Sequence, residues 1–325
     1  MYTDFYKLQA LPFRLTPDPR FFYNSSVHSR AMAHLTFGIS QGEGFIVITG
    51  DIGAGKTTLL DHLMTTLDRA HLVTASLATT QLDDRDTLRM IADAFSLRVA
   101  GQDKAILVHE LRRFLSELHA ARKRAVLFVD EVQNLGVLSL EELRMLSNFQ
   151  IDGSPPLQCL LLGQPQFNQM LARPELEQLR QRMIAAYHLG PLSQDETIAY
   201  VEHRLRTAGW AGDPAFSATA LEGIFRATGG VPRRINLVCG RLMMFGFLEG
   251  KHAFEAADVA AVVDDMEADA ASVIAAPAPG AGAHADGLAT RLEALEARLA
   301  RHERILRRMA GIYDEFVEGD GERKP

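Results

Sequence analysis

The stretch Gly50-Asp51-Ile52-Gly53-Ala54-Gly55-Lys56-Thr57 decides the fold of this chain. It is a complete G-x-x-x-x-G-K-[ST] pattern, preceded by the strand-like run Phe45-Ile46-Val47-Ile48 and followed by the helix-like run Thr58-Leu59-Leu60-Asp61-His62-Leu63. In such a strand–loop–helix unit, glycines let backbone N–H groups surround phosphate oxygens, and the start of the helix adds its positive dipole end. We therefore expect a nucleoside triphosphate here, with Lys56 at the β- and γ-phosphates and Thr57 as a ligand of Mg²⁺.

Length and composition bound the class of protein. The 325 residues allow two domains and an appendage, and 47% hydrophobic with 23% charged residues is ordinary for a globular protein. A net charge of −7 gives no overall reason to expect nucleic-acid binding. Cys159 and Cys239 stand in apolar stretches, so we expect both to be buried and reduced. Neither a signal peptide nor a run of ~18 apolar residues is recognisable, which predicts a cytoplasmic protein, with peripheral association at a membrane left open.

The pattern of apolar residues divides the chain into segments. Residues 1–43 combine a Pro-rich, aromatic opening with a helix at 26–41. In residues 44–190, strand-like runs alternate with helical ones, which predicts a parallel sheet covered by helices on both faces. The expected strands are 44–49, 71–76, 125–130, 157–163 and 184–189, and the expected helices are about 55–69, 84–97, 103–121, 139–150 and 166–181.

The pattern of apolar residues changes after residue 190. Residues 191–267 show helical periodicity without a strand signal, which predicts a small all-helical lid domain with helices at 193–208, 216–227, 232–248 and 255–267. Residues 268–287 are rich in Ala, Pro and Gly, as in a flexible linker. Residues 288–317 carry a heptad pattern that predicts a coiled-coil helix. Self-association, folding back on the body and docking on a membrane surface all remain open for this helix.

A second motif complements the phosphate loop. The apolar run 125–129 ends in Asp130-Glu131, which is typical of a Walker B strand. Asp130 would hold Mg²⁺ and Glu131 would orient or deprotonate the attacking water. The chain lacks the Asn-Lys-x-Asp element of GTPases, so ATP is favoured. The expected nucleotide-binding residues are Gly50, Asp51, Ile52, Gly53, Ala54, Gly55, Lys56, Thr57, Thr58 and Asp130, of which Thr57 and Asp130 would bind Mg²⁺.

Three further polar positions are candidates for the site. Gln164, at the tip of a strand, is placed to contact the γ-phosphate or the water, or else to cap the next helix. Arg182, or second Arg180, is placed to act on a neighbouring subunit's nucleotide as an arginine finger, the alternative being a salt bridge or a solvated face. Arg233 or Arg234, on the first turn of a helix that follows Gly229-Gly230, is placed to reach the phosphates, because a guanidinium pairs with phosphate through two N–H groups. The alternative is a basic helix start with no phosphate partner, opposed to the helix dipole.

The aromatic opening is the remaining unexplained segment. Phe13, Tyr23 and His28 are candidates for lining an adenine pocket, and plain packing of the same residues is an equally good interpretation.

Taken together, these elements resemble the AAA+ ATPases. More closely, residues 1–267 resemble the ExeA/GspA-type secretion ATPases, most of all the subfamily associated with exosortase (XrtA/PEP-CTERM) exopolysaccharide loci. The motifs that carry the resemblance are Pro12-Phe13-x-Leu15-Thr16-Pro17-Asp18-Pro19-x-Phe21-Phe22-Tyr23, His28, Gly42-Glu43-Gly44-Phe45, Gly163-Gln164-Pro165, Leu179-Arg180-Gln181-Arg182 and Gly230-x-Pro232-Arg233-x-Ile235-Asn236.

The resemblance implies the P-loop NTPase fold, ATP and Mg²⁺, and a homo-oligomer with ATP at subunit interfaces. Lys56, Thr57, Asp130 and Glu131 would be the nucleotide and catalytic residues, with Gln164 at the sensor-1 position and Arg233 at sensor 2. ExeA-type proteins continue into a transmembrane segment and a peptidoglycan-binding part, whereas this chain continues into the linker and the heptad helix. Peptidoglycan binding and secretin assembly are therefore not carried over.

Three functions are compatible with these residues. The first is an ATPase that drives or regulates an inner-membrane export or assembly system, with export components as partners and exopolysaccharide or PEP-CTERM secretion as the setting. The second is a DNA-associated ATPase that regulates transposition or origins, although no DNA-reading module beyond the arginines of the heptad helix is recognisable. The third is a nucleotide-gated scaffold with little turnover.

Overall fold

The computed structural model describes residues 2–78, 86–98 and 103–274. The end of the linker and the heptad helix 288–317 lie outside these residues. The described chain separates into two compact units. The larger unit comprises Pro12–Ala208 and Thr228–Leu237, and the smaller unit comprises the described parts of Met1–Leu11, Gly209–Ala227 and Val238–Pro325.

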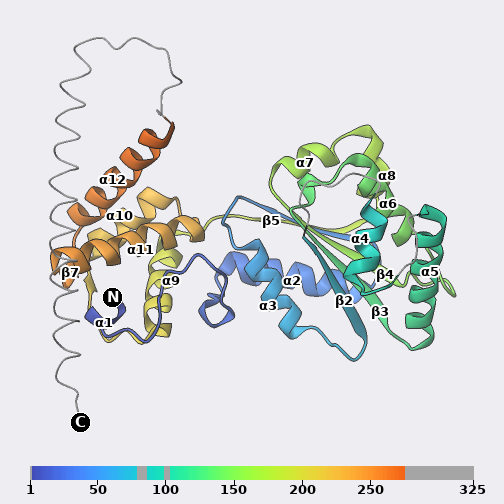
Figure 1. Ribbon diagram of the computed structural model, residues 1–325, viewed down its shortest axis with the longest axis horizontal. Coiled ribbons are helices and arrows are strands. Elements are labelled where there is room, and N and C mark those ends of the chain that lie inside the picture. Colours follow the sequence, from blue (N-terminus) through green and yellow to red (C-terminus); the bar gives the residue numbers. More distant parts are fainter. Residues whose placement is uncertain (1, 79–85, 99–102, 275–325) are drawn as a thin grey trace, which may run out of the picture. The chain divides into compact units, whose positions relative to one another are not determined.

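The larger unit is built on a five-stranded parallel sheet (Figure 1). Its strand order is β2-β3-β4-β1-β5, so β1, which leads into the phosphate loop, lies between β4 and β5. The expected parallel sheet is confirmed, with strand ends within about two residues of the predicted ones. The strands are β1 (Phe45–Gly50), β2 (Leu72–Ala78), β3 (Arg124–Asp130), β4 (Leu157–Gly163) and β5 (Met183–Leu189).

Helices cover both faces of this sheet, as predicted. Successive side chains of a strand point to opposite faces. Ile46 and Ile48 therefore pack in a core with α2 (Ser26–Gln41) and α3 (Lys56–Thr66). Phe45 and Val47 face the other core, formed with α4 (Thr87–Ala94), α5 (Lys104–Ala120), α6 (Val137–Ser147) and α7 (Gln166–Leu171). Apolar residues on both sides explain why the strands read as continuous apolar runs.

Two expected helices differ from the structure. The helix expected at 166–181 is wrong as a single element, because α7 is followed by the 3₁₀ turn Pro174–Leu176 and the short α8 (Glu177–Arg180). Pro174 lacks an N–H donor and disfavours helical backbone at the residue before it, which breaks the helix. The helix expected at 84–97 is also shorter, since α4 covers only Thr87–Ala94.

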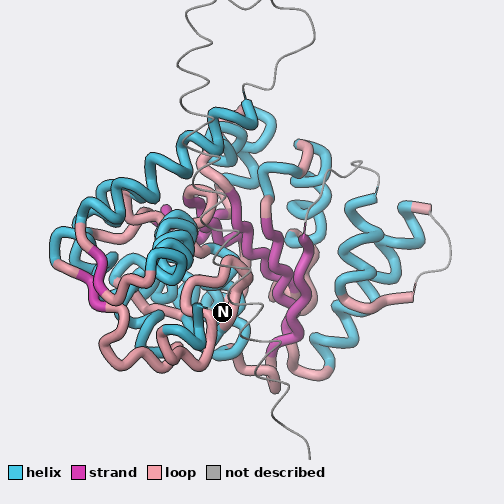
Figure 2. Tube along the Cα trace, turned by 60° about the vertical axis from the view of Figure 1, so that its left-hand side comes forward, coloured by secondary structure: helices cyan, strands magenta, loops and turns pink. Residues whose placement is uncertain are grey.

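The region after β5 is mostly helical. It contains α9 (Gln194–Thr207), which belongs to the larger unit and begins with a capping box, then α10 (Ala218–Thr228), α11 (Pro232–Glu249) and α12 (Ala256–Ile274). The expectation of no strands here is wrong. Ala215–Phe216 and Ala253–Phe254 pair in parallel as β6 and β7 in the smaller unit (magenta in Figure 2), and two residues are too few to produce an alternating pattern.

Both cysteines are buried thiols, as expected. Residues 2–11 and 12–25 also contain short helical turns, α1 (Tyr2–Phe5) and the 3₁₀ turn Pro19–Phe21. Within the described ranges, no helix has both the length and the apolarity needed to span a membrane.

Candidate functional site

The phosphate loop lies at the carboxyl edge of the sheet, between β1 and α3. Gly53 and Gly55 adopt left-handed backbone with φ of 83° and 97°. A Cβ atom at Gly53 would lie 2.4 Å from Cβ of Arg233, and one at Gly55 would lie 2.9 Å from Nε2 of His28. Both glycines are therefore required by backbone conformation and by crowding.

Lys56 is the charged group inside this loop. It is 6% exposed, and its Nζ donates to the carbonyl oxygens of Gly50 at 2.7 Å and Asp51 at 3.1 Å. Burial lowers the pKa of Lys56, and the negative charges of Glu131 and Asp130 oppose that effect. The loop carbonyls thus hold the ammonium group in the turn that would surround a phosphate.

Thr57 and Asp130 form the part of the site that suits a metal ion. The Thr57 hydroxyl donates to Oδ2 of Asp130 at 2.9 Å, and Oδ1 of Asp130 accepts from the backbone N–H of Glu131 at 2.8 Å. A hydroxyl and a carboxylate in contact, beside a phosphate loop, fit Mg²⁺, which is bound in proteins by one or two oxygen side chains together with phosphates and water.

Glu131 follows Asp130 and is held by two amides. Its backbone is left-handed, with φ of 52° and ψ of 41°, which is uncommon for a residue with a side chain. Oε2 of Glu131 accepts from Nε2 of Gln164 at 3.0 Å and from Nε2 of Gln133. The Gln164 side chain therefore contacts the carboxylate, and α7 has no side-chain cap. Sequence reasoning missed Gln133, whose only signal was its place two residues after Glu131.

The candidate arginines fall in two places. Arg233, at the start of α11, donates its backbone N–H to the Gly53 carbonyl at 3.1 Å. Arg233 and Arg234 are both exposed, and only Arg233 lines the pocket. Arg180 donates to the Leu171 carbonyl at 2.7 Å, and Arg182 donates to Oγ of Ser147 at 3.2 Å.

Arg182 lies at the amino end of β1, because its carbonyl accepts from the N–H of Phe45 at 2.9 Å. The phosphate loop begins at Gly50, the other end of this strand. At ~3.3 Å per residue the two ends are about 17 Å apart. Within one chain, the structure does not bring Arg182 to the nucleotide-binding residues.

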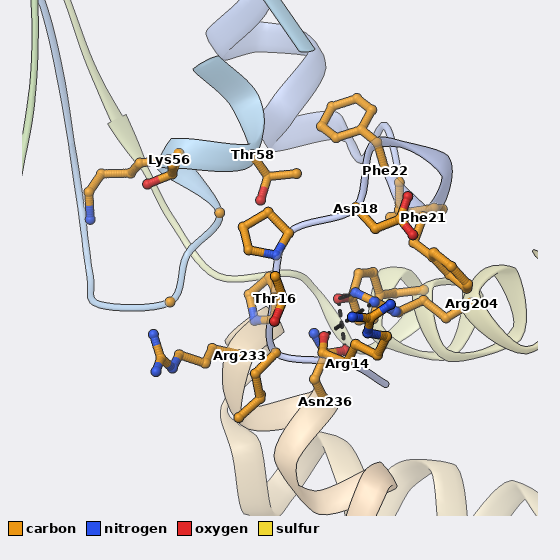
Figure 3. A pocket seen from close by; sticks show the side chains of 18 of the residues that line it. Arg14, Thr16, Asp18, Phe21, Phe22, Lys56, Thr58, Arg204, Arg233 and Asn236 are labelled. Atoms are coloured by element: carbon orange, nitrogen blue, oxygen red, sulfur yellow. Dashed lines mark hydrogen bonds between the residues drawn. The ribbon is translucent and has the colours of Figure 1, made fainter. Parts of the chain in front are cut away.

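One pocket joins the phosphate loop to the aromatic opening, and all of its lining belongs to the larger unit (Figure 3). Of the three residues considered for adenine, Tyr23 and His28 line this pocket and Phe13 is buried without lining it. We call Pro12–Ser25 the strap. The phosphate side is lined by Ile52, Gly53, Gly55, Lys56, Thr57, Thr58, Glu131 and Arg233, and the strap contributes Arg14, Leu15, Thr16, Pro17, Asp18, Phe21, Phe22 and Tyr23.

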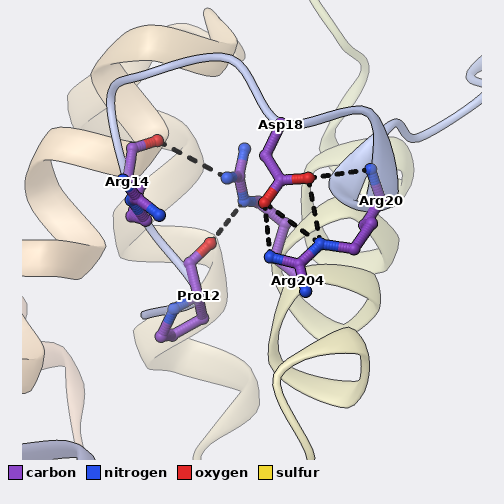
Figure 4. Close-up of polar contacts among 5 residues, drawn as sticks. All are labelled: Pro12, Arg14, Asp18, Arg20 and Arg204. Atoms are coloured by element: carbon purple, nitrogen blue, oxygen red, sulfur yellow. Dashed lines mark hydrogen bonds and ion pairs between the residues drawn. The ribbon is translucent and has the colours of Figure 1, made fainter. Parts of the chain in front are cut away.

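Arg204 of α9 fastens the strap (Figure 4). Arg204 is 7% exposed, and its guanidinium donates to the Pro12 carbonyl at 2.5 Å and to the Tyr200 hydroxyl at 2.8 Å. Tyr200 in turn donates to Oδ1 of Asn236 at 2.9 Å, on the helix that carries Arg233. A buried hydrogen-bonded chain therefore connects the strap with Asn236, about one turn into α11.

His28 of α2 packs against the phosphate loop at Gly55. Its Nδ1 lies 2.7 Å from Oγ of Ser25, the cap of α2, and its Nε2 faces Gly55. Burial lowers the pKa of His28 to about 4, although Glu196 and the backbone of Ala54 oppose the shift. The imidazole is therefore neutral near pH 7, so it adds no positive charge to the loop.

Comparison with known proteins agrees with this geometry. Residues 39–171 match the family model described as an AAA domain. The fold and the phosphate-loop site of this region are those of a P-loop ATPase domain of the AAA class. Over 265 residues the chain is 42% identical to General secretion pathway protein A of Aeromonas hydrophila. That match covers 80% of this chain and 47% of the relative, so the chain spans about half the relative's length.

Solved structures share the fold at low identity. The ORC2 protein of Aeropyrum pernix, in its ADPNP-ADP complexes, superposes with a TM-score of 0.55 at 15% identity, covering 77% of this chain and 72% of that chain. Cdc6p of Pyrobaculum aerophilum superposes with a TM-score of 0.56 at 16% identity, covering 73% and 68%. At such identities the likeness concerns the fold alone.

Proposed function

We propose that this chain hydrolyses ATP to drive or regulate an export or assembly system at the inner membrane. The observation that carries the proposal is the convergence of Lys56, Thr57, Asp130 and Glu131 on one edge of the sheet. The similarity to a general secretion pathway protein supports the cellular setting.

The chain's own residues account for binding. Lys56 leaves the carbonyls of Gly50 and Asp51 to meet the β- and γ-phosphates, and backbone N–H groups of the loop take the remaining phosphate oxygens. Thr57 and Asp130 would hold Mg²⁺, which would neutralise charge on the phosphates. The strap side of the pocket, with Tyr23, receives the base.

Hydrolysis then depends on placing a water molecule. Glu131 orients that water or takes its proton, and Gln164 holds the Glu131 carboxylate at 3.0 Å. Arg233 contributes charge at the phosphates from the first turn of α11. Phosphoryl transfer needs positioning and charge stabilisation more than covalent chemistry, and these groups are the part of the site that one chain supplies.

Variants of Glu131 test the reaction. Glu131→Gln should abolish turnover while ATP still binds, because the amide keeps the shape of the side chain and loses the base. Equal and negligible rates for wild type and Glu131→Gln would indicate a nucleotide-gated scaffold instead. Turnover stimulated by DNA, with salt-sensitive DNA binding, would indicate a DNA-associated ATPase.

The active form is proposed to be a homo-oligomer in which Arg182 completes the neighbour's site. Its position at the amino end of β1 keeps Arg182 away from its own phosphate loop. Mixing inactive Arg182→Ala with inactive Lys56→Ala should restore activity at interfaces that pair an intact loop with an intact arginine, about a quarter of random interfaces. No recovery in mixtures shown to exchange subunits would contradict the assignment.

The setting is proposed to be exopolysaccharide or PEP-CTERM-associated secretion, with the protein cytoplasmic and peripheral at the inner membrane. Cell fractionation tests the location: recovery with the membrane, released by high salt, is expected. Gene neighbourhood tests the setting, since an adjacent exosortase and chain-length regulator would support it and an adjacent transposase would contradict it.

A further inference from the structure

Gln133 is bound at both ends of its side chain. It lies in the 3₁₀ turn Val132–Asn134 that follows β3. Its Nε2 donates to Oε2 of Glu131, and its Oε1 accepts from the backbone N–H of Gln164 at 2.9 Å. One amide therefore connects the carboxylate at the end of β3 with the backbone at the end of β4.

The surroundings leave little freedom to this amide. A Cβ atom at Gly163 would lie 3.0 Å from Oε1 of Gln133 and 2.8 Å from Cγ1 of Val132. The Gln133 side chain therefore passes close to the backbone of Gly163, the last residue of β4, where a larger residue would crowd it. Val132 is fully buried, so the turn that carries Gln133 is anchored in the core.

We infer that Gln133 is a positioning residue which, together with Gln164, sets the direction of the Glu131 carboxylate. Both amides donate to the same oxygen, Oε2, and this fixes the rotation of the carboxyl group. The left-handed backbone of Glu131 has its N–H held by Asp130 at 2.8 Å, which fixes the start of the same side chain. The inference rests on the proposed role of Glu131 in orienting or deprotonating water.

The chemical consequence concerns the rate and not the binding of ATP. A displacement of a catalytic group by about 1 Å can cost ~100-fold in rate. Loss of the Gln133 amide removes one donor from Oε2 and releases the backbone N–H of Gln164, so the carboxylate gains rotational freedom. Gln133 makes no bond with the phosphate loop among the described contacts, so the affinity for ATP should not change.

The experiment measures kcat, KM and ATP affinity in Gln133→Met, which keeps the length of the side chain and removes both polar atoms. We expect kcat to fall about 10- to 100-fold with the Kd for ATP within about twofold of wild type, a change of under ~0.5 kcal/mol. Gln133→Asn, whose amide is too short to bridge both partners, should also lower kcat. Gln41→Met, at the exposed end of α2, is the matched control and should behave as wild type.

A double-mutant comparison separates positioning from a general structural effect. If Gln133 and Gln164 act as one unit on Oε2, Gln133→Met/Gln164→Met should be no more than about threefold slower than the slower single variant. Multiplying effects, an unchanged kcat in Gln133→Met, or a rise in Kd that accounts for the loss would overturn the inference. Glu131→Gln separates a failure of the proposed function from a failure of the inference about Gln133. Retained turnover in Glu131→Gln refutes the role of Glu131. Abolished turnover in Glu131→Gln together with full activity in Gln133→Met refutes only the positioning role of Gln133.

Discussion

Gly230→Ala should destabilise the protein far more than Gly229→Ala. The two glycines precede α11, the helix that carries Arg233, and both have left-handed backbone, with φ of 60° at Gly229 and 73° at Gly230. A Cβ atom at Gly229 would meet no atom within 4 Å, whereas one at Gly230 would lie 2.0 Å from the carbonyl oxygen of Leu192. Leu192 also donates its backbone N–H to the Gly230 carbonyl at 2.9 Å.

The magnitude follows from these contacts. Placing alanine in left-handed backbone costs about 1–2 kcal/mol, of which the stiffer unfolded chain recovers about 0.4–1 kcal/mol. Gly229→Ala should therefore lower the free energy of unfolding by at most about 1.6 kcal/mol. In Gly230→Ala the backbone must also move off the Leu192 carbonyl, and an unpaired N–H at buried Leu192 adds about 1–3 kcal/mol. The strain of moving packed backbone adds to this, so the two variants should differ by at least ~2 kcal/mol.

Urea unfolding of both variants in one buffer measures this difference. Isothermal titration with ATP measures the second consequence, which is weaker binding in Gly230→Ala because the start of α11 carries Arg233 onto Gly53. Gly229→Ala is the control, because it has similar backbone strain and no contact with the Leu192 carbonyl. Free energies of unfolding within about 0.5 kcal/mol of each other would refute the reasoning.

Three other predictions concern the pocket. Lys56→Ala should raise the Kd for ATP about 10- to 100-fold, because hydrogen bonds to charged groups contribute about 1.5–3 kcal/mol; an unchanged Kd by titration would contradict the role of Lys56. Burial lowers the pKa of His28 from 6.5 to about 4, so between these pH values only the unfolded chain takes up the proton. The free energy of unfolding should therefore fall as the pH drops through this window. The loss reaches about 3 kcal/mol near pH 4, and urea midpoints of His28→Asn should lack this slope; equal slopes would count against the assignment. Arg204→Met should release the strap, speeding amide hydrogen exchange in residues 12–25 and weakening ATP binding, and unchanged exchange there would count against the fastening role of Arg204.

Local sequence patterns predicted the parts of the site whose geometry is local. The phosphate loop and its helix follow from glycine spacing and from the run of apolar residues before Gly50. Asp130 and Glu131 were identifiable because they end an apolar strand. The helix break at Pro174 was equally local, and the pattern of apolar residues obscured it because Leu171, Leu176 and Leu179 are all buried across the break.

Other parts of the site join residues that are far apart in the chain. Gln133 reaches Gln164, Arg204 reaches Pro12, and Arg233 reaches Gly53, across separations that no local spacing encodes. Folding brings these residues together. It is driven by the burial of apolar surface, which is not directional, so the residues that become neighbours cannot be derived from residue types alone.

The sequence by itself therefore determined the nucleotide loop, the acidic strand end and the parallel sheet, because periodicity and glycine spacing act over a few residues. Only the tertiary structure decided that Glu131 is held by two amides, that the strap is fastened by a buried arginine, and that Arg182 stands at the far end of β1 from its own loop. The first and the last of these relations depend on the strand order β2-β3-β4-β1-β5, which makes β3 a neighbour of β4 and β1 a neighbour of β5.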